Sequence, residues 1–154
     1  MEARIDYANV SPGALKGMLE AFVRRSGLET KLLELVKIRA SQMNGCAYCI
    51  DMHTKDARAQ GETEQRIYAL DAWRETPFFT EKERAALGWT EALTNIQQGH
   101  APEAIYQELA RHFSEEERVS LTLAITTINA WNRIAIGFRA VPGSYQPGSL
   151  QRSA

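Results

Sequence analysis

Two cysteines three residues apart are the most reactive feature of this sequence. Cys46 and Cys49 are its only cysteines, and residues at positions i and i+3 of a helix lie on the same side. Two thiols held this close can form a disulfide after a modest adjustment. The spacing therefore predicts a redox-active dithiol or part of a metal site, because a bridge across so short a loop adds little stability.

The residues just before the cysteines predict that both thiols lie at the start of a helix. Asn44 and Gly45 tolerate a left-handed backbone and end the preceding helix. The first turn of the next helix has unpaired N–H groups and a partial positive charge, which both favour a thiolate. We therefore expect a cysteine pKa below the ~8.5 of a free cysteine.

An imidazole and a carboxylate are spaced to serve the thiols. His53 follows Cys49 by one helical turn and can take or return a thiol proton. Glu34 lies twelve residues before Cys46, and a reversal between the two helices brings an inward-facing Glu34 to the same pocket. A buried carboxylate needs such a partner. With the hydroxyl of Tyr48, these five side chains form the predicted catalytic set.

A zinc site is the main alternative interpretation of these residues. Cys46, Cys49, His53 and Glu34 offer four ligands of the right types. Structural zinc sites, however, usually take a ligand from a second, distant Cys/His pair, which this sequence lacks. We therefore predict no metal and no bound cofactor. A second alternative is that the two thiols are packed and inert, with Glu34 on the surface and His53 structural.

The order Glu34, twelve residues on Cys46-x-x-Cys49, then His53 resembles the AhpD-like alkylhydroperoxidases of the carboxymuconolactone decarboxylase superfamily. The segment Trp131-Asn132-Arg133 is also similar. The resemblance implies an all-helical fold and a thiol-dependent peroxidase, in which Cys49 attacks the hydroperoxide, Cys46 resolves the sulfenic acid, and Glu34 and His53 relay protons.

The resemblance also implies the substrate, the reductant and the oligomeric state. It implies a hydroperoxide substrate, a lipoyl-bearing or thioredoxin-like dithiol reductant, and a homo-oligomer, either a trimer or a hexamer.

Where the best-known enzymes have a histidine before the second cysteine, this chain has Tyr48, a poor base at neutral pH. From helix electrostatics, Cys46 is the alternative reactive and exposed thiol. The alternative functions are a thiol–disulfide oxidoreductase or redox sensor, and a non-redox, decarboxylase-like member.

Helical periodicity over most of the chain predicts an all-α, single-domain bundle of about seven helices, with the dithiol at the start of the third. Two capping boxes, Thr80 with Glu83 and Ser114 with Glu117, mark helix starts. The last helix is apolar around most of its circumference, which predicts burial in the core or at a subunit contact. We expect a helical domain over 1–140 and an arm or disordered tail over 141–154. The predicted helices cover about 11–26, 29–43, 46–60, 63–74, 81–97, 102–112 and 115–138.

Composition is that of a soluble globular protein. The chain has 154 residues, of which 44% are hydrophobic, and a net charge of −1. This balance does not favour binding to nucleic acid or to an anionic membrane. No apolar run approaches the ~18 residues of a membrane span, and the N-terminus does not look like a signal peptide. We therefore expect a cytoplasmic protein.

Overall fold

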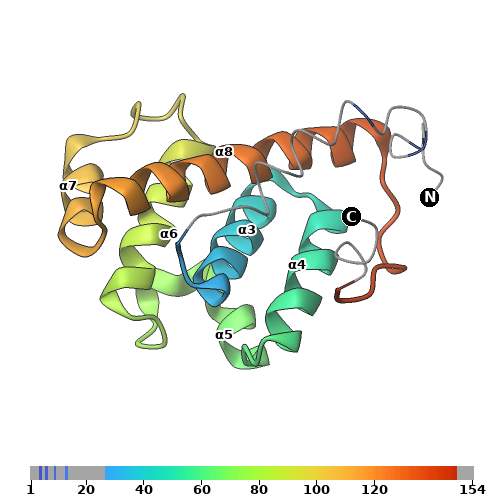
Figure 1. Cartoon of the computed structure of the whole chain (residues 1–154), viewed down its shortest axis with the longest axis horizontal. Helices are drawn as coiled ribbons and strands as arrows, with labels where there is room; N and C mark the ends of the chain where they lie inside the picture. The colour runs from blue at the N-terminus through green and yellow to red at the C-terminus, as the bar shows by residue number, and fades with distance from the viewer. Residues whose placement is uncertain (1–3, 5, 7–8, 10–12, 14–26, 149–154) are drawn as a thin grey trace.

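The computed structural model describes residues 4, 6, 9, 13 and 27–148 of the chain (Figure 1). Within this part the chain is all helical, which confirms the predicted class. The predicted first helix, over about 11–26, lies almost wholly outside the described residues. The described elements are α3 (Thr30–Asn44), α4 (Ala47–Ala59), α5 (Glu64–Ala69), a 3-10 segment η1 (Leu70–Glu75), α6 (Glu81–Thr94), α7 (Glu103–His112) and α8 (Glu115–Phe138).

Helix α3 is the centre of the fold. It packs against α4, α6 and α8, and α8 crosses these helices along one side (Figure 1). Leu35, Val36 and Ile38 on α3 have no exposed surface. Gly45 ends α3 with φ 69°, a left-handed conformation that glycine adopts without steric cost. The chain reverses there and begins α4, as the sequence predicted.

The region predicted as one helix over 63–74 contains two elements. Helix α5 is followed by the 3-10 segment η1, so the second half of that prediction was wrong. Ile67, Leu70 and Trp73 are spaced three residues apart and are all buried. In a 3-10 helix residues i and i+3 lie on one face. The tighter winding therefore turns Leu70 and Trp73 into the same core cluster.

Helices α6, α7 and α8 follow the predicted pattern closely. The capping boxes at Thr80 and Ser114 are both formed, so the start of α6 and the start of α8 are confirmed. Helix α6 ends at Thr94, three residues earlier than predicted, because Asn95 leaves helical geometry and starts a turn. In the single chain α8 is buried on one face; Val119 and Leu123 are exposed on its other face, and Ile136 is exposed near its C-terminal end.

The segment 141–148 lies against α4. Lys55 Nζ donates to the carbonyl oxygens of Gly143 and Tyr145, at 3.2 and 3.1 Å. The Tyr145 hydroxyl donates to the Asp56 carboxylate at 2.9 Å. The described part of the predicted tail is therefore an ordered arm. Among the described helices, none has the length and apolar character needed to cross a membrane.

Candidate active site

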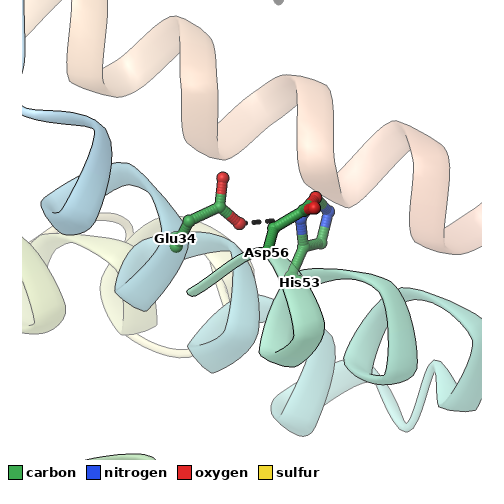
Figure 2. Close-up of side chains that lie close together, drawn as sticks. All are labelled: Glu34, His53 and Asp56. Atoms are coloured by element: carbon green, nitrogen blue, oxygen red, sulfur yellow. Dashed lines mark hydrogen bonds and ion pairs between the residues drawn. The ribbon is translucent and has the colours of Figure 1, made fainter. Parts of the chain in front are cut away.

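Glu34 and His53 meet in the interior of the protein. The antiparallel α3 and α4 place His53 Nδ1 3.0 Å from Glu34 Oε2, and Figure 2 shows the two side chains reaching toward each other from these helices. Glu34 is 3% exposed and His53 is 6% exposed. The structure thus brings together the predicted carboxylate and imidazole. The alternative in which Glu34 lies on the surface is wrong.

A buried lysine that sequence reasoning missed also contacts the Glu34 carboxylate. Lys37, one turn after Glu34 on α3, is itself buried and forms an ion pair with the Glu34 carboxylate. Burial alone raises the pKa of Glu34, but the hydrogen bond from His53 and the charge of Lys37 outweigh it, so the pKa is lowered. Glu34 is therefore ionised at neutral pH. The three-residue spacing between Glu34 and Lys37 could have indicated this ion pair, because residues at i and i+3 of a helix are neighbours.

His53 is held as a neutral base. Burial lowers its pKa below the ordinary value for histidine, and the nearby Lys37 charge adds to this effect, although Glu34 opposes it. Because the ionised Glu34 only accepts hydrogen bonds, His53 Nδ1 carries the hydrogen that it donates. The other ring nitrogen, Nε2, then keeps its lone pair. This is the protonation state that a general base requires.

The two thiols lie together at the start of α4. Cys46 is the N-cap residue, and its sulfur accepts the Cys49 backbone N–H at 3.4 Å. Both are free thiols. Cys46 is 1% exposed and Cys49 4% exposed, so the expectation of an exposed thiol at Cys46 is wrong. Cys49 and His53 both lie on the buried side of α4, one turn apart.

The two sulfurs differ in their affinity for a proton. The Cys49 thiol donates to Cys46, and this hydrogen bond, with others from Asn132 and the Tyr48 backbone, lowers the pKa of Cys46 to about 7 despite burial. The same hydrogen bond to Cys46, together with burial, raises the pKa of Cys49. The prediction of a low cysteine pKa is confirmed for Cys46 and is wrong for Cys49.

Tyr48 packs beside the dithiol. Its half-buried ring contacts the apolar cluster of Ala40, Cys46, Cys49, Ile128 and Ala135. Burial raises the pKa of its hydroxyl, so Tyr48 stays protonated at neutral pH. Its backbone N–H donates a hydrogen bond to the Cys46 sulfur. A role of the Tyr48 hydroxyl in proton transfer stays a prediction.

The described residues do not gather the thiols into the four-ligand zinc site considered above. The metal-binding atoms that come within 4.8 Å of one another belong to Glu34, His53 and Asp56 (Figure 2). Asp56, one turn after His53 on α4, accepts a hydrogen bond from Tyr145. Sequence reasoning missed both residues. Spacing could have indicated Asp56, but Tyr145 comes from the distant arm.

A buried amide network underlies the dithiol. Asn132 on α8 is fully buried. Its Nδ2 donates to Ser41 Oγ at 3.0 Å, and its Oδ1 accepts from Asn44 Nδ2 at 2.8 Å. Asn132 also hydrogen-bonds to the side chains of Cys46 and Cys49. The network therefore joins α8 and the end of α3 to the start of α4, where the thiols lie.

Comparisons with known proteins show which family the sequence belongs to. The model of the carboxymuconolactone decarboxylase family matches residues 12–92. The chain is 47% identical over 138 residues to the uncharacterized protein YdfG of Bacillus subtilis, which is 88% of this chain and 94% of YdfG.

Solved structures share the fold. The crystal structure of ATU0492 from Agrobacterium tumefaciens, a protein of unknown function and putative antioxidant defence protein AhpD, matches with a TM-score of 0.89 and 47% identity over 94% of this chain and 100% of that chain. An alkylhydroperoxidase AhpD core, the uncharacterized peroxidase-related protein of Ralstonia eutropha, matches with a TM-score of 0.78 and 17% identity over 89% of this chain and 74% of that chain. The chain therefore belongs to the carboxymuconolactone decarboxylase family, as an AhpD-like member.

Proposed function

We propose that this protein reduces hydroperoxides through a dithiol–disulfide cycle of Cys46 and Cys49, with Glu34 and His53 moving the protons. AhpD-like membership supports a peroxidase-related function in general. The observation that carries the finer proposal is the placement of both thiols at the start of α4, where the Cys46 sulfur accepts the backbone N–H of Cys49, with a neutral His53 one turn beyond Cys49 on the same buried side. This arrangement supplies a thiolate, a second thiol and a base.

The cycle balances with these groups and a hydroperoxide. One thiolate attacks a peroxide oxygen and the O–O bond breaks, giving a sulfenic acid and an alkoxide, which takes a proton from water and leaves as the alcohol; the sulfur is oxidised and the peroxide reduced. The second thiol then loses its proton and attacks the sulfenic sulfur. The S–S bond forms, the S–O bond breaks, and the leaving hydroxide takes a proton to become water. A dithiol reductant restores both thiols by exchange.

Partners are part of the same proposal. Because both sulfurs are almost fully buried, we expect small hydroperoxides and a slender dithiol, such as a lipoyl group, to be used more readily than bulky ones. A thioredoxin-like protein remains the other reductant that the family resemblance implies. We also propose that copies of the chain associate, because Val119, Leu123 and Ile136 on α8 are exposed in the single chain.

Peroxide consumption with dihydrolipoamide as the electron donor tests the function. We expect turnover in the wild-type protein and none in Cys46→Ser or Cys49→Ser, since either change removes one sulfur of the disulfide. A matched control is Glu62→Gln, which removes a buried carboxylate that pairs with Arg66 rather than with the site. Turnover that survives the loss of either cysteine refutes the proposal. A disulfide that forms without turnover would favour the redox-sensor alternative.

A further inference from the structure

A second carboxylate lies beside the Glu34–His53 pair. Asp56 follows His53 by one turn of α4, and one of its oxygens lies within 4.8 Å of both a Glu34 oxygen and a His53 ring nitrogen. Figure 2 shows the Asp56 carboxylate next to the imidazole ring. Asp56 is partly buried, whereas Glu34 and His53 are almost fully buried. The proton relay proposed above does not use this carboxylate.

Both carboxylates already have donors from the protein. Glu34 is bonded by Lys37 and by His53. The Tyr145 hydroxyl, from the 141–148 arm, lies 2.9 and 3.0 Å from the two oxygens of Asp56, which share its one hydrogen. A metal ion bound here would have to displace these donors. We therefore interpret Glu34, Lys37, His53 and Asp56 as a cluster of charges, named below the charge cluster.

The charge cluster is neutral only when His53 carries a proton. The charged side chains that act most strongly on His53 are Glu34 and Lys37 from α3 and Asp56 from α4. With a neutral His53, the two carboxylates and the Lys37 ammonium leave a surplus negative charge, and a proton on His53 cancels it. Without Asp56, the same proton would leave a surplus positive charge in the interior, which burial penalises.

Tyr145 favours the ionised form of Asp56. Burial raises the pKa of Asp56 above its ordinary value, and the nearby Glu34 adds to this effect. The hydrogen bond from Tyr145 opposes the rise, because it stabilises the charged carboxylate. Burial and Asp56 in turn raise the pKa of Tyr145, so its hydroxyl stays protonated and remains a donor. The arm thereby supports the negative charge beside His53.

We propose that Asp56, held by Tyr145 of the arm, is the counter-charge of the His53 imidazolium. The inference rests on the proposed function, in which His53 takes a thiol proton. In that step the S–H bond breaks and an N–H bond forms at Nε2; the proton later passes to the hydroxide that leaves the sulfenic sulfur. Asp56 stabilises the protonated ring between these two events, whichever sulfur attacks the peroxide. Asp56 and Tyr145 act through His53 and are positioning residues.

The titration of the His53 ring tests the counter-charge without any peroxide. The chain has three histidines, so the imidazole NMR signals of His53 are assigned by their loss in His53→Gln, and His100 and His112 are internal references. Asp56→Asn can still accept from Tyr145 but has no charge. It should lower the pKa of His53, so that the ring binds a proton about tenfold less tightly, as expected for one charge at this distance.

Two further variants separate the arm from a general effect of charge. Tyr145→Phe should lower the pKa of His53 in the same direction but by less, since Asp56 keeps its carboxylate and loses only a donor. Glu62→Gln removes a buried carboxylate that pairs with Arg66 outside the site and makes the same change in net charge. It should leave the titration of His53 unchanged. Thermal unfolding is measured for every variant.

Turnover shows whether the cycle uses the counter-charge. Asp56→Asn should lower the kcat of hydroperoxide reduction at pH 7 about 3- to 10-fold with KM unchanged, because a weaker base takes the thiol proton more slowly. Asp56→Glu keeps the charge and should restore most of this loss. A merely structural role of Asp56 would change the unfolding temperature but would move neither the His53 titration nor kcat in this pattern.

Each result decides one part of the inference. An unchanged His53 titration in Asp56→Asn overturns it, and so does a wild-type His53 ring that stays neutral until the protein unfolds in acid. An unchanged titration in Tyr145→Phe overturns the role of the arm, and a shifted titration without loss of kcat overturns the part of Asp56 in the cycle. If the wild-type protein does not reduce hydroperoxides, the proposed function fails, while the titrations still decide whether Asp56 is the counter-charge.

Discussion

Replacing Glu34 by glutamine should cost both stability and turnover, because its carboxylate serves two buried groups. It pairs with Lys37 and accepts the Nδ1 hydrogen of His53 at 3.0 Å. Glutamine has nearly the same shape but no charge. We therefore expect Glu34→Gln to weaken the ion pair and to loosen the imidazole from the orientation that leaves Nε2 as the base.

The size of the effect follows from burial. Removing one partner of a buried ion pair typically costs ~3–5 kcal/mol. The glutamine oxygen can still accept from His53, and such a retained hydrogen bond offsets ~1 kcal/mol. The expected net loss is about 3 kcal/mol, which a domain with ~5–15 kcal/mol of stability survives. Turnover should fall ~10²-fold, the lower part of the range for acid–base catalysis.

Urea unfolding and peroxide turnover of Glu34→Gln, beside Glu62→Gln, test this reasoning. Glu62 is 8% exposed and pairs with Arg66 at 2.8 Å, so its loss should cost similar stability without loss of turnover. The folded-state pKa of Glu34 is lowered. Its stabilising contribution is thus present above the unfolded pKa of ~4.3 and lost as the pH falls through the folded value. Equal turnover in the two variants would refute a role for Glu34 beyond stability.

Three further predictions concern the thiols and their supports. The rate at which wild-type protein reacts with excess hydroperoxide should rise with pH, reach half of its plateau near pH 7 and level off about one pH unit higher, as the dithiol loses its first proton; a midpoint at or above ~8.5 contradicts this. Gly45→Ala should cost about 1 kcal/mol in urea unfolding, because φ is 69° there; an unchanged midpoint argues against it. Tyr145→Phe should cost about 1–2 kcal/mol by loss of its hydrogen bonds to Asp56, and equal stability would show that the Tyr145 hydroxyl does not stabilise the fold.

Local sequence signals were sufficient to predict most of the described helices and the meeting of Glu34 with His53. The capping box at Ser114 fixes the start of α8 through neighbouring residues alone. The reversal at Gly45 is likewise local, and it brings Glu34 to His53 because α4 packs back against α3 after the turn. These features depend on residues close in sequence.

Lys37 and Asp56 lie one helical turn from predicted site residues and could have been identified by spacing, but the other features that the sequence did not predict depend on distant contacts. The 3-10 winding of η1 follows from burial of Trp73 against residues from several helices. Asn132 meets Ser41 from 91 positions away, and Tyr145 meets Asp56 from 89. The similarity of the 131–133 segment to the family marked Asn132, but only packing of α8 over the α3–α4 turn places it beside the sulfurs.

Peptide mass mapping after one equivalent of hydroperoxide tests the dithiol cycle most directly. We expect the peptide containing Cys46 and Cys49 to lose two hydrogen atoms, both thiols to disappear together, and a dithiol to restore them. Hydroperoxide consumed while both thiols remain titratable, or no change in thiol content at all, would contradict it.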